Sequence, residues 1–527
     1  MRIKLFHPPR IYGINPNTGI IPDNVIPPLM PPLAIPVLKS YLERNGVEAA
    51  SDDLFIKVWH RNYFGTHPGE EIDLLPFNDR ERVFAYIDGG VDKELARYGR
   101  LLTDMIDIGG YDIFGISIVE DVSFSTFGAT LVIAKFIKEA TGKPIVVGGR
   151  LKKQHGIDLL NTGLIDYMVL GERGEVPLLK LLQHLQGKGA IEDVPCLIYR
   201  DGAEIKDTFY RVFMTFEFPN FDGLPLDMYR YFHGRMPGQE HLADYDPDTQ
   251  GLLILPYYFV NGCQCNCTFC KESQNRRFRV KRAREVAADL ARLSERYNTR
   301  YFFFINSNVN PSLKYMVQLC RSFKEYGLDI RWSDCATFKH LDEAVLEQMR
   351  EAGATRLIYG IESGSQNMIS AIEKGFTLDH AQRIIDEAHQ VGIWNEVELI
   401  AGLPHETQQD INATLRFINR NTDNIQLFHL NKFYLVENSS YYLNADQYGL
   451  SGIKPNMKSL LDTRFFKFRF DETEGLHWKQ KVQQINASYD AVDAHRRKIN
   501  TFVEIYPLHY LYEKYKTKEA VLANLNR

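Results

Sequence analysis

Short apolar runs alternate with amphipathic stretches over the first 190 residues. The apolar runs predict strands at Ile3–His7, Ile113–Val119, Pro144–Val147 and Tyr167–Leu170. The amphipathic stretches predict helices at about 33–46, at about 125–141 and from about 177. Strand, helix, strand at this spacing is typical of parallel crossovers. We therefore expect an α/β fold that begins with a doubly wound, Rossmann-like sheet. The pattern assigns no role to residues 54–110.

A second alternation of the same kind begins at Leu252. Its predicted strands are Leu252–Tyr258, Tyr301–Ile305, Ile330–Ser333, Arg356–Ile361, Glu396–Ile400 and Ile425–Leu430. Six such units fit a partial parallel (β/α)6 barrel, in which ligands lie at the carboxyl ends of the strands. The predicted domains are 1–215, a connector at 216–250, a barrel at 251–435, and a mainly helical segment at 436–527 that shapes the substrate pocket. A hairpin is expected at 196–207.

The composition is that of a soluble chain with room for more than one core. Of its 527 residues 44% are hydrophobic, and the formal net charge is -5. Proteins that bind nucleic acid along its backbone carry a basic surplus, so the charge argues against a nucleic-acid partner. The sequence has no apolar run of about 18 residues. It opens on a strand pattern rather than a signal peptide, so we expect a cytoplasmic protein without a membrane span.

Small residues stand where the predicted N-terminal strands end. They are Ser117, Gly148, Gly149 and Gly171, and Glu172 follows the last of them. Ligands of doubly wound sheets sit beyond the carboxyl ends of the strands, which predicts a binding surface here. Glycines after strands also serve only to turn the chain. The pattern by itself leaves both interpretations open.

Four of the 7 cysteines fall within eight residues, in the segment NGCQCNCTFCKE at 261–272. Such a group in a large chain predicts metal binding rather than disulfides. Cys263, Cys267 and Cys270 can hold three irons of a cubane cluster and leave the fourth iron open. A closed zinc site requires a fourth Cys or His ligand. No matching ligand pair follows downstream, and Cys265 lies between two other cysteines, where its geometry would be strained.

The cysteine segment, with Phe269 before its last cysteine, resembles the CxxxCxΦC motif of the radical S-adenosylmethionine (SAM) superfamily. The segment GIESGS at 360–365 closes the fourth predicted barrel strand, and AGLPHET at 401–407 closes the fifth. Both patterns recur in radical SAM enzymes that carry an N-terminal cobalamin-binding domain. The predicted first domain stands where that domain should be. The resemblance covers about residues 1–430.

The resemblance implies that Cys263, Cys267 and Cys270 bind a 4Fe-4S cluster and that SAM chelates its open iron. Reductive cleavage of SAM then requires an electron from an external donor of the flavodoxin or ferredoxin type. Many members have a Gly-Gly-Glu segment after the second barrel strand, which receives the amino group of SAM. Asn306 and Ser307 stand there in this chain. Both are polar, but neither is charged.

Other residues around SAM are also implied by the resemblance. Phe269 would lie near the adenine, and Leu403 would line the adenine pocket. Glu362 and Ser363 would bind the ribose or the amino group, since a carboxylate accepts charge-assisted hydrogen bonds. Two alternatives stay open. Glu362 could instead form a structural ion pair with a nearby Lys or Arg, and Leu403 could be part of the core.

The resemblance further implies cobalamin over the N-terminal strand ends described above. No histidine stands in the Asp-x-His-x-x-Gly pattern that supplies a ligand to cobalt, because His155 is followed directly by Gly156 and lacks the aspartate. In the radical SAM branch cobalt is often bound without histidine. The implied activity is therefore cobalamin-dependent methylation of an unactivated carbon of a small-molecule substrate.

Alternatives to that activity remain, and the role of one further cysteine stays open. Cyclisation or rearrangement could occur on the same scaffold, and a non-catalytic cobalamin or iron–sulfur sensor represents a different class. Cys335 follows the third barrel strand, where it could contact substrate or be a buried structural thiol. The sequence does not choose between these two roles.

Overall fold

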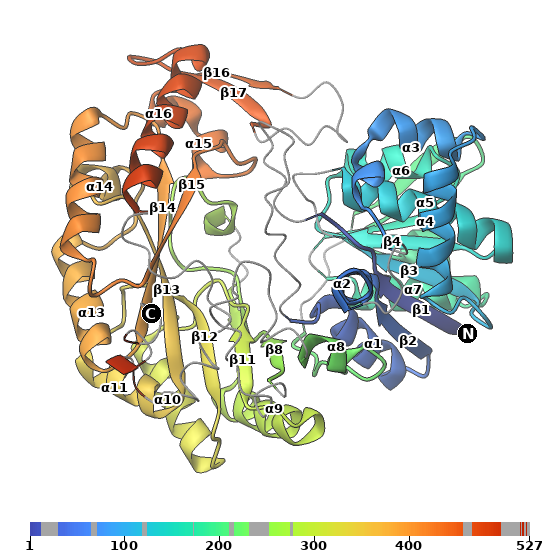
Figure 1. The fold of residues 1–527 in the computed structure, drawn as a ribbon, viewed down its shortest axis with the longest axis horizontal. Helices are drawn as coiled ribbons and strands as arrows, with labels where there is room; N and C mark the ends of the chain where they lie inside the picture. Colours follow the sequence, from blue (N-terminus) through green and yellow to red (C-terminus); the bar gives the residue numbers. More distant parts are fainter. Residues whose placement is uncertain are drawn as a thin grey trace. The chain divides into compact units, whose positions relative to one another are not determined.

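The computed structural model describes residues 1–11, 30–64, 71–118, 124–171, 173–209, 215–230, 252–274, 278–456 and 466–496, together with positions 517, 519, 520 and 523. The chain forms two compact units, one ending at Gly251 and one beginning at Leu252 (Figure 1). Within the described ranges, no helix has the length and apolar character needed to cross a membrane.

The first unit is built on a 7-stranded sheet with the order β2-β1-β3-β4-β5-β6-β7. Its strands are β1 (Arg2–His7), β2 (Glu48–Asp53), β3 (Ile113–Ser117), β4 (Ile145–Gly149), β5 (Tyr167–Leu170), β6 (Leu197–Asp201) and β7 (Glu204–Thr208). Strands β1 to β5 pair in parallel. The expected hairpin, β6 and β7, adds two antiparallel strands at one edge.

Helices cover both faces of this sheet, which confirms the doubly wound prediction. On one face α3 (Arg80–Ile87), α4 (Lys93–Asp104) and α5 (Ser125–Thr141) share a core with Phe114 and Val147. On the other face α1 (Ala34–Arg44) and α7 (Glu175–Leu185) share a core with Ile3 and Val146. The remaining helices of the unit are α2 (Leu54–Phe64), η1 (Leu75–Asn78), α6 (Lys153–Leu160), η2 (Ile191–Asp193) and α8 (Leu226–Arg230).

Two parts of this unit were not predicted from the pattern. The strand β2 has the polar sequence EAASDD, which shows no apolar run. Its Asp52 pairs with Lys4 at 3.3 Å and with Lys57 at 2.7 Å, so tertiary ion pairs stabilise the strand. The described residues of 54–110 form α2, η1, α3 and α4, and all four contribute to the core of one face.

Part of the expected connector packs on the first sheet. Asn220 N donates to Pro36 O at 3.0 Å, and Ser51 Oγ donates to Asp222 O at 2.8 Å. The hydroxyl of Tyr229, in α8, donates to buried Asp53 at the end of β2. Residues 217–230 therefore close the carboxyl end of β2 within the first unit.

The second unit contains a 6-stranded, fully parallel sheet with the order β15-β14-β13-β12-β11-β8. The strands are β8 (Ile254–Tyr257), β11 (Tyr301–Phe304), β12 (Arg331–Ala336), β13 (Ala354–Glu362), β14 (Trp394–Ala401) and β15 (Leu427–Lys432). The helices between them are α9 (Ala283–Tyr297), α10 (Leu313–Glu325), α11 (Glu343–Glu351), α12 (Gln366–Ala371), α13 (Leu378–Gln390) and α14 (Gln408–Arg420). Figure 1 shows α9, α10, α11, α13 and α14 following the sheet, as a partial barrel requires.

After the barrel strands the chain forms a mixture of elements. A helix, α15 (Ser440–Leu443), and a turn, η6 (Ala445–Tyr448), precede the antiparallel strands β16 (Leu450–Pro455) and β17 (Phe468–Glu472). The long helix α16 (Trp478–Arg496) then packs on β14, β15 and α14. The expected helix is present, and the β16–β17 pair is an addition to it. The aromatic-rich end of the chain lies outside the described residues.

Candidate functional site

The predicted cluster ligands lie in a loop between β9 (Val260–Asn261) and η5 (Lys271–Gln274). Cys267 is buried, and Cys263 and Cys270 are partly exposed. The loop is held by its backbone, because Thr268 N donates to Ile372 O at 3.2 Å and Thr268 O accepts from Tyr441 N at 3.0 Å. These bonds hold the backbone of the loop after the first barrel strand.

Two lysines supply positive charge to this loop. Burial raises the pKa of Cys267 to about 11, and Lys374 offsets part of that rise. A hydrogen bond with Cys263, together with the charges of Lys339 and Lys374, lowers the pKa of Cys265. Metal clusters are bound by thiolates rather than thiols. The lysine charges therefore favour the thiolate form of Cys267 and Cys265, whereas the hydrogen bond with Cys265 raises the pKa of Cys263.

The spacing of the sulfur atoms bears on the zinc alternative. Thiolates about 2.3 Å from one tetrahedral zinc ion lie about 3.8 Å from one another. Among the His, Cys, Asp and Glu side chains that the structure describes, one group brings three ligand atoms within 4.8 Å of each other, and it consists of Glu396, Glu398 and His429. Cys263, Cys267 and Cys270 do not form a second group of this kind. Their assignment as cluster ligands stays a prediction.

Phe269 and Glu362 both lie beside Lys374, which the sequence analysis did not identify as a site residue. Lys374 Nζ lies 3.0 Å from Glu362 Oε1, and both side chains are buried. The same ammonium lies 5.6 Å from the centre of the Phe269 ring. A Cβ at Gly360 would stand 2.5 Å from Glu362 Oε1, so a side chain there would crowd this pair. Glu362 therefore has the ion pair that was considered as the alternative to a SAM contact.

The backbone at Glu362 is strained. Its φ is 68°, a conformation that is uncommon for residues other than glycine, and the strand pairing shifts between Gly360 and Glu362. Such strain persists where the surrounding structure enforces it, and it is concentrated at functional sites. One carboxylate oxygen of Glu362 is bound to Lys374. The strained position is consistent with the predicted role in binding SAM.

The rest of the GIESGS segment contacts α14. Ser363 Oγ lies 3.2 Å from Thr414 Oγ1, and Gly364 N donates to the same oxygen at 3.0 Å. Ser365 Oγ donates to Asp410. Ser363 is buried in this network. The structure therefore separates Ser363, which anchors the segment, from Glu362, which lies beside Lys374.

Asn306 and Ser307 have different surroundings. Asn306 Oδ1 accepts from Phe259 N at 3.0 Å and from Val260 N at 2.8 Å, and its Nδ2 donates to Asp334 Oδ2 at 2.6 Å. Burial raises the pKa of Asp334 well above its ordinary value. Asn306 thus fixes the start of the cysteine loop, whereas Ser307 is exposed at the end of β11.

Leu403 is fully buried in a core with Phe433 and Tyr441, and Phe269 packs against this core. Lys481, in α16, donates to Leu403 O at 2.7 Å. Gly402 N donates to Glu406 Oε2 at 2.8 Å, and burial raises the pKa of Glu406 to about 7. The AGLPHET segment is therefore fixed by α16, and Leu403 has the core position that was considered as its alternative.

In the first unit, the predicted small residues lie together at the ends of β3, β4 and β5. Gly171 N donates to Gly149 O at 3.1 Å, and a Cβ at Gly149 would stand 1.9 Å from Ile118 O. A Cβ at Gly148 would make only ordinary contacts, and one at Gly171 would meet no atom within 4 Å. Ser117 is partly exposed beside them. Glu172 lies outside the described residues.

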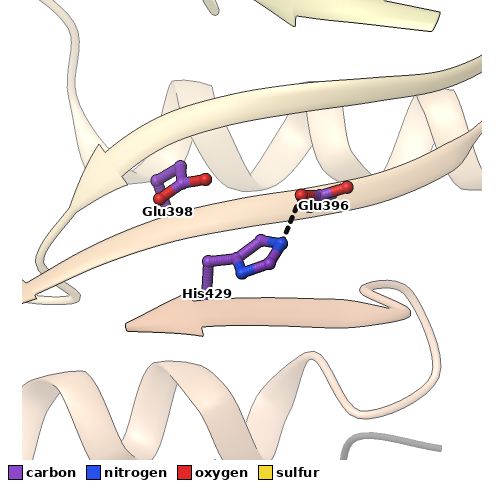
Figure 2. Close-up of side chains that lie close together, drawn as sticks. All are labelled: Glu396, Glu398 and His429. Atoms are coloured by element: carbon purple, nitrogen blue, oxygen red, sulfur yellow. Dashed lines mark ion pairs between the residues drawn. The ribbon is translucent and has the colours of Figure 1, made fainter. Parts of the chain in front are cut away.

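A charged group that the sequence analysis missed lies on β13, β14 and β15 (Figure 2). Glu396 Oε2 accepts from Arg356 Nη1 at 2.7 Å, and Glu396 Oε1 lies 2.6 Å from His429 Nε2. Glu398 lies beside them and accepts from Asn431 at 2.9 Å. The signal was available, because Glu396 and Glu398 alternate with apolar residues, as do His429 and Asn431. Such alternation predicts one polar face, whereas a strand covered on both faces shows a continuous apolar run.

Residues 257–418 match the family model described as the radical SAM superfamily. This part of the chain is a radical SAM domain. This confirms the resemblance drawn from the cysteine motif, and members of this superfamily bind a 4Fe-4S cluster and SAM. Cys263, Cys267 and Cys270 provide a donor set of the right chemistry for such a cluster.

Two curated relatives of this radical SAM chain are methyltransferases by name. An uncharacterized methyltransferase of Pyrococcus horikoshii is 24% identical over 314 residues, which cover 58% of this chain and 63% of the relative. Cytidylyl-2-hydroxyethylphosphonate methyltransferase of Streptomyces wedmorensis is 23% identical over 423 residues, which cover 75% of this chain and 73% of the relative. The chain thus spans less than two thirds of the first relative's length.

Two solved structures share the radical SAM fold over most of the chain. The methyltransferase TsrM of Kitasatospora setae, with cobalamin and an iron–sulfur cluster bound, gives a TM-score of 0.59 at 16% identity and covers 94% of this chain and 90% of its own. The cobalamin-dependent radical enzyme OxsB gives a TM-score of 0.63 at 14% identity and covers 99% of this chain and 74% of its own. Both likenesses show the fold and extend over both units.

Proposed function

We propose that this chain is a cobalamin-dependent radical SAM enzyme that methylates an unactivated carbon of a small-molecule substrate. The observation that carries the proposal is the combination of two sites in one chain. One is a three-cysteine loop beside Lys374 and Glu362, and the other is a doubly wound sheet with small residues at its strand ends. Structures with cobalamin bound and relatives named methyltransferases support it.

Each group in the proposal has residues to hold it. Cys263, Cys267 and Cys270 would bind the cluster, and Lys374 would hold Glu362 in place for SAM. The open space at Gly171, beside the small residue Gly148, would admit the flat face of cobalamin. When bound, the cluster with SAM supplies a radical that removes a hydrogen atom, and cobalamin supplies a transferable methyl group. The protein aligns these groups with the substrate and excludes competing reactions.

A radical cyclase is the second candidate. Two relatives are named anaerobic magnesium-protoporphyrin IX monomethyl ester cyclase, one from Rubrivivax gelatinosus at 23% identity over 161 residues and one from Cereibacter sphaeroides at 23% identity over 260 residues. Cyclisation on this scaffold would use the same cysteine loop. It differs from methylation in that no methyl group moves.

The decisive experiment is anaerobic reconstitution with iron, sulfide and cobalamin, followed by reductant and SAM that carries a labelled methyl group. We expect 5′-deoxyadenosine to form and the label to reach cobalamin. Absence of 5′-deoxyadenosine from the fully loaded protein would refute a radical enzyme. Formation of 5′-deoxyadenosine without label on cobalamin would favour the cyclase.

A matched pair of cysteine variants tests the cluster site. The triple change of Cys263, Cys267 and Cys270 to Ala should remove the brown chromophore and all 5′-deoxyadenosine. Cys265→Ala should retain both, because the fourth cysteine of the loop is not an expected ligand. Loss of the chromophore in Cys265→Ala would show that the ligand assignment is wrong.

A further inference from the structure

The group on β13, β14 and β15 combines a buried carboxylate with an accessible imidazole. The side chains of Arg356 and Glu396 are 4% and 3% exposed, whereas the side chain of His429 is 40% exposed. Glu396 is held from both sides, by Arg356 Nη1 at 2.7 Å and by His429 Nε2 at 2.6 Å. Because Nε2 faces Glu396, the other ring nitrogen, Nδ1, is the one available to a ligand.

The strand register places this group on the face of the sheet turned away from α13. Gly360 pairs with Glu398, and Glu398 pairs with His429, so these positions share one face. The opposite face includes Asn395, which donates to Ile385 O of α13 at 2.9 Å. Glu362 lies just beyond Gly360, and its charge helps to raise the pKa of Glu398. The group therefore lies on the inner face of the barrel, beside the predicted SAM residue.

The charges around His429 favour a proton over a metal ion. Ligand atoms of Glu396, Glu398 and His429 lie within 4.8 Å of one another, which would suffice for a divalent cation. However, the guanidinium of Arg356 already neutralises Glu396 and repels a second cation. Burial opposes a charge on His429, but its hydrogen bond to Glu396 and the charges of Glu396 and Glu398 raise its pKa in spite of Arg356.

We propose that His429 is a proton-transfer residue of this barrel, positioned by Glu396, and that the substrate carries a hydroxyl or N–H group which it deprotonates. The inference rests on the proposed function and names the substrate class for it. A carboxylate that receives the Nε2 hydrogen fixes the tautomer in which Nδ1 carries the lone pair. Arg356 in turn fixes the carboxylate.

This proton transfer to His429 requires no oxidant or reductant. The O–H or N–H bond of the substrate breaks, its electron pair stays on oxygen or nitrogen, and the proton bonds to Nδ1 of His429. Glu396 stabilises the imidazolium that results, and the exposed ring returns the proton to water. Deprotonation of a hydroxyl weakens the C–H bond on the same carbon. The substrate thereby becomes easier to attack at the carbon that receives the methyl group.

The test uses diethylpyrocarbonate, which modifies unprotonated imidazole nitrogen, on the full chain, with the modified peptides identified by mass spectrometry. His380 is the internal control, because its Nε2 lies 3.0 Å from Phe338 O and its Nδ1 lies 3.2 Å from Arg383. We expect His429 to react at least about tenfold faster than His380 at pH 8. Its rate should fall about tenfold for each pH unit below its pKa.

Two variants test the positioning role. Glu396→Gln should move the pH profile of His429 modification to lower pH, because it removes the charge that stabilises the imidazolium. Glu398→Gln should move it in the same direction by a smaller amount, and this variant leaves the buried pair with Arg356 intact. A His429 rate no greater than that of His380, or a profile unchanged in both variants, would overturn the proposal. So would stoichiometric Mn²⁺ or Zn²⁺ binding that Glu398→Gln abolishes.

Different experiments test the proposed function and this inference, so either can be refuted without the other. Modification of His429 is measured on the chain without turnover, whereas the radical activity is measured by 5′-deoxyadenosine in the reconstituted protein. A reactive His429 in a chain that makes no 5′-deoxyadenosine would refute the enzyme and leave an accessible imidazole. An unreactive His429 in an active chain would refute the inference alone.

Discussion

The parallel strands of the two sheets carry chemically different residues. At the ends of β3, β4 and β5 the backbones approach so closely that Gly149 has no room for a Cβ, and the side chains are small. The second sheet carries buried ion pairs instead, Glu362 with Lys374 at the end of β13 and Glu396 with Arg356 within β13 and β14. The first region is therefore sensitive to added volume and the second to lost charge. A flat ligand requires strand ends without bulky side chains, and a charged ligand or a transferred proton requires charged side chains.

The largest expected effect comes from removing a charge in the second region. Arg356→Met leaves Glu396 buried with only His429 to balance it, and breaking a buried pair in this way costs about 3–5 kcal/mol. We expect the free energy of unfolding of the barrel, measured by urea denaturation, to fall by that amount. The control is Arg331→Met, since Arg331 pairs with exposed Asp329 and such pairs contribute less than about 1 kcal/mol. Equal effects of the two changes would contradict the contrast between the regions.

Added volume in the first region should have the next largest effect. The Cβ of Gly149→Ala would stand 1.9 Å from Ile118 O, whereas that of Gly148→Ala would stand 3.5 Å from Val169 O. Overpacking of this kind costs about 1–3 kcal/mol. We expect Gly149→Ala to lower the urea midpoint of the first unit and Gly148→Ala to leave it unchanged. If Gly148→Ala keeps the fold but loses cobalamin in a binding titration, the strand ends are a ligand surface rather than a turn.

A hydrogen bond that anchors the GIESGS segment should contribute less to the free energy of unfolding than either of these features. Thr414→Val removes the hydroxyl that accepts from Gly364 N at 3.0 Å, which costs about 1 kcal/mol. Thr414→Ser retains the hydroxyl and serves as the control. We expect Thr414→Val to weaken SAM binding as well, because the segment positions Glu362. SAM affinity equal in the two variants would show that Glu362 is held by Lys374 alone.

Much of the fold could be predicted from the sequence, because apolar runs such as those of β3 and β11 define buried parallel strands without help from distant residues. The strand β2 could not, since it is polar and its Asp52 and Asp53 are paired with Lys4, Lys57 and Tyr229 from other elements. Hydrophobic periodicity indicates which side chains face a core. It does not indicate which charged side chains form ion pairs with residues that are distant in sequence.

The candidate site shows the same limit. The cysteine loop and Glu362 are recognisable because their spacing is local in sequence. Lys374 lies in a turn after α12, and nothing in its neighbourhood indicates that it reaches both Glu362 and Phe269. The roles of Ser363 and Asn306 also depend on partners, Thr414 and Asp334, that only the fold brings near.

The smallest expected effect is a pH dependence of stability that belongs to the second region. The pKa of His429 is raised in the folded chain, so its ion pair with Glu396 contributes stability that is fully present below the ordinary pKa of about 6.5. That contribution is lost as pH rises through the higher, folded-state pKa. We therefore expect the urea midpoint of the barrel to fall between about pH 6 and pH 9, and to fall less in His429→Gln. Burial also raises the pKa of Glu398, whose ionisation destabilises the fold from a lower pH upward. A wild-type profile that coincides with that of His429→Gln would show that the imidazole does not gain a proton on folding.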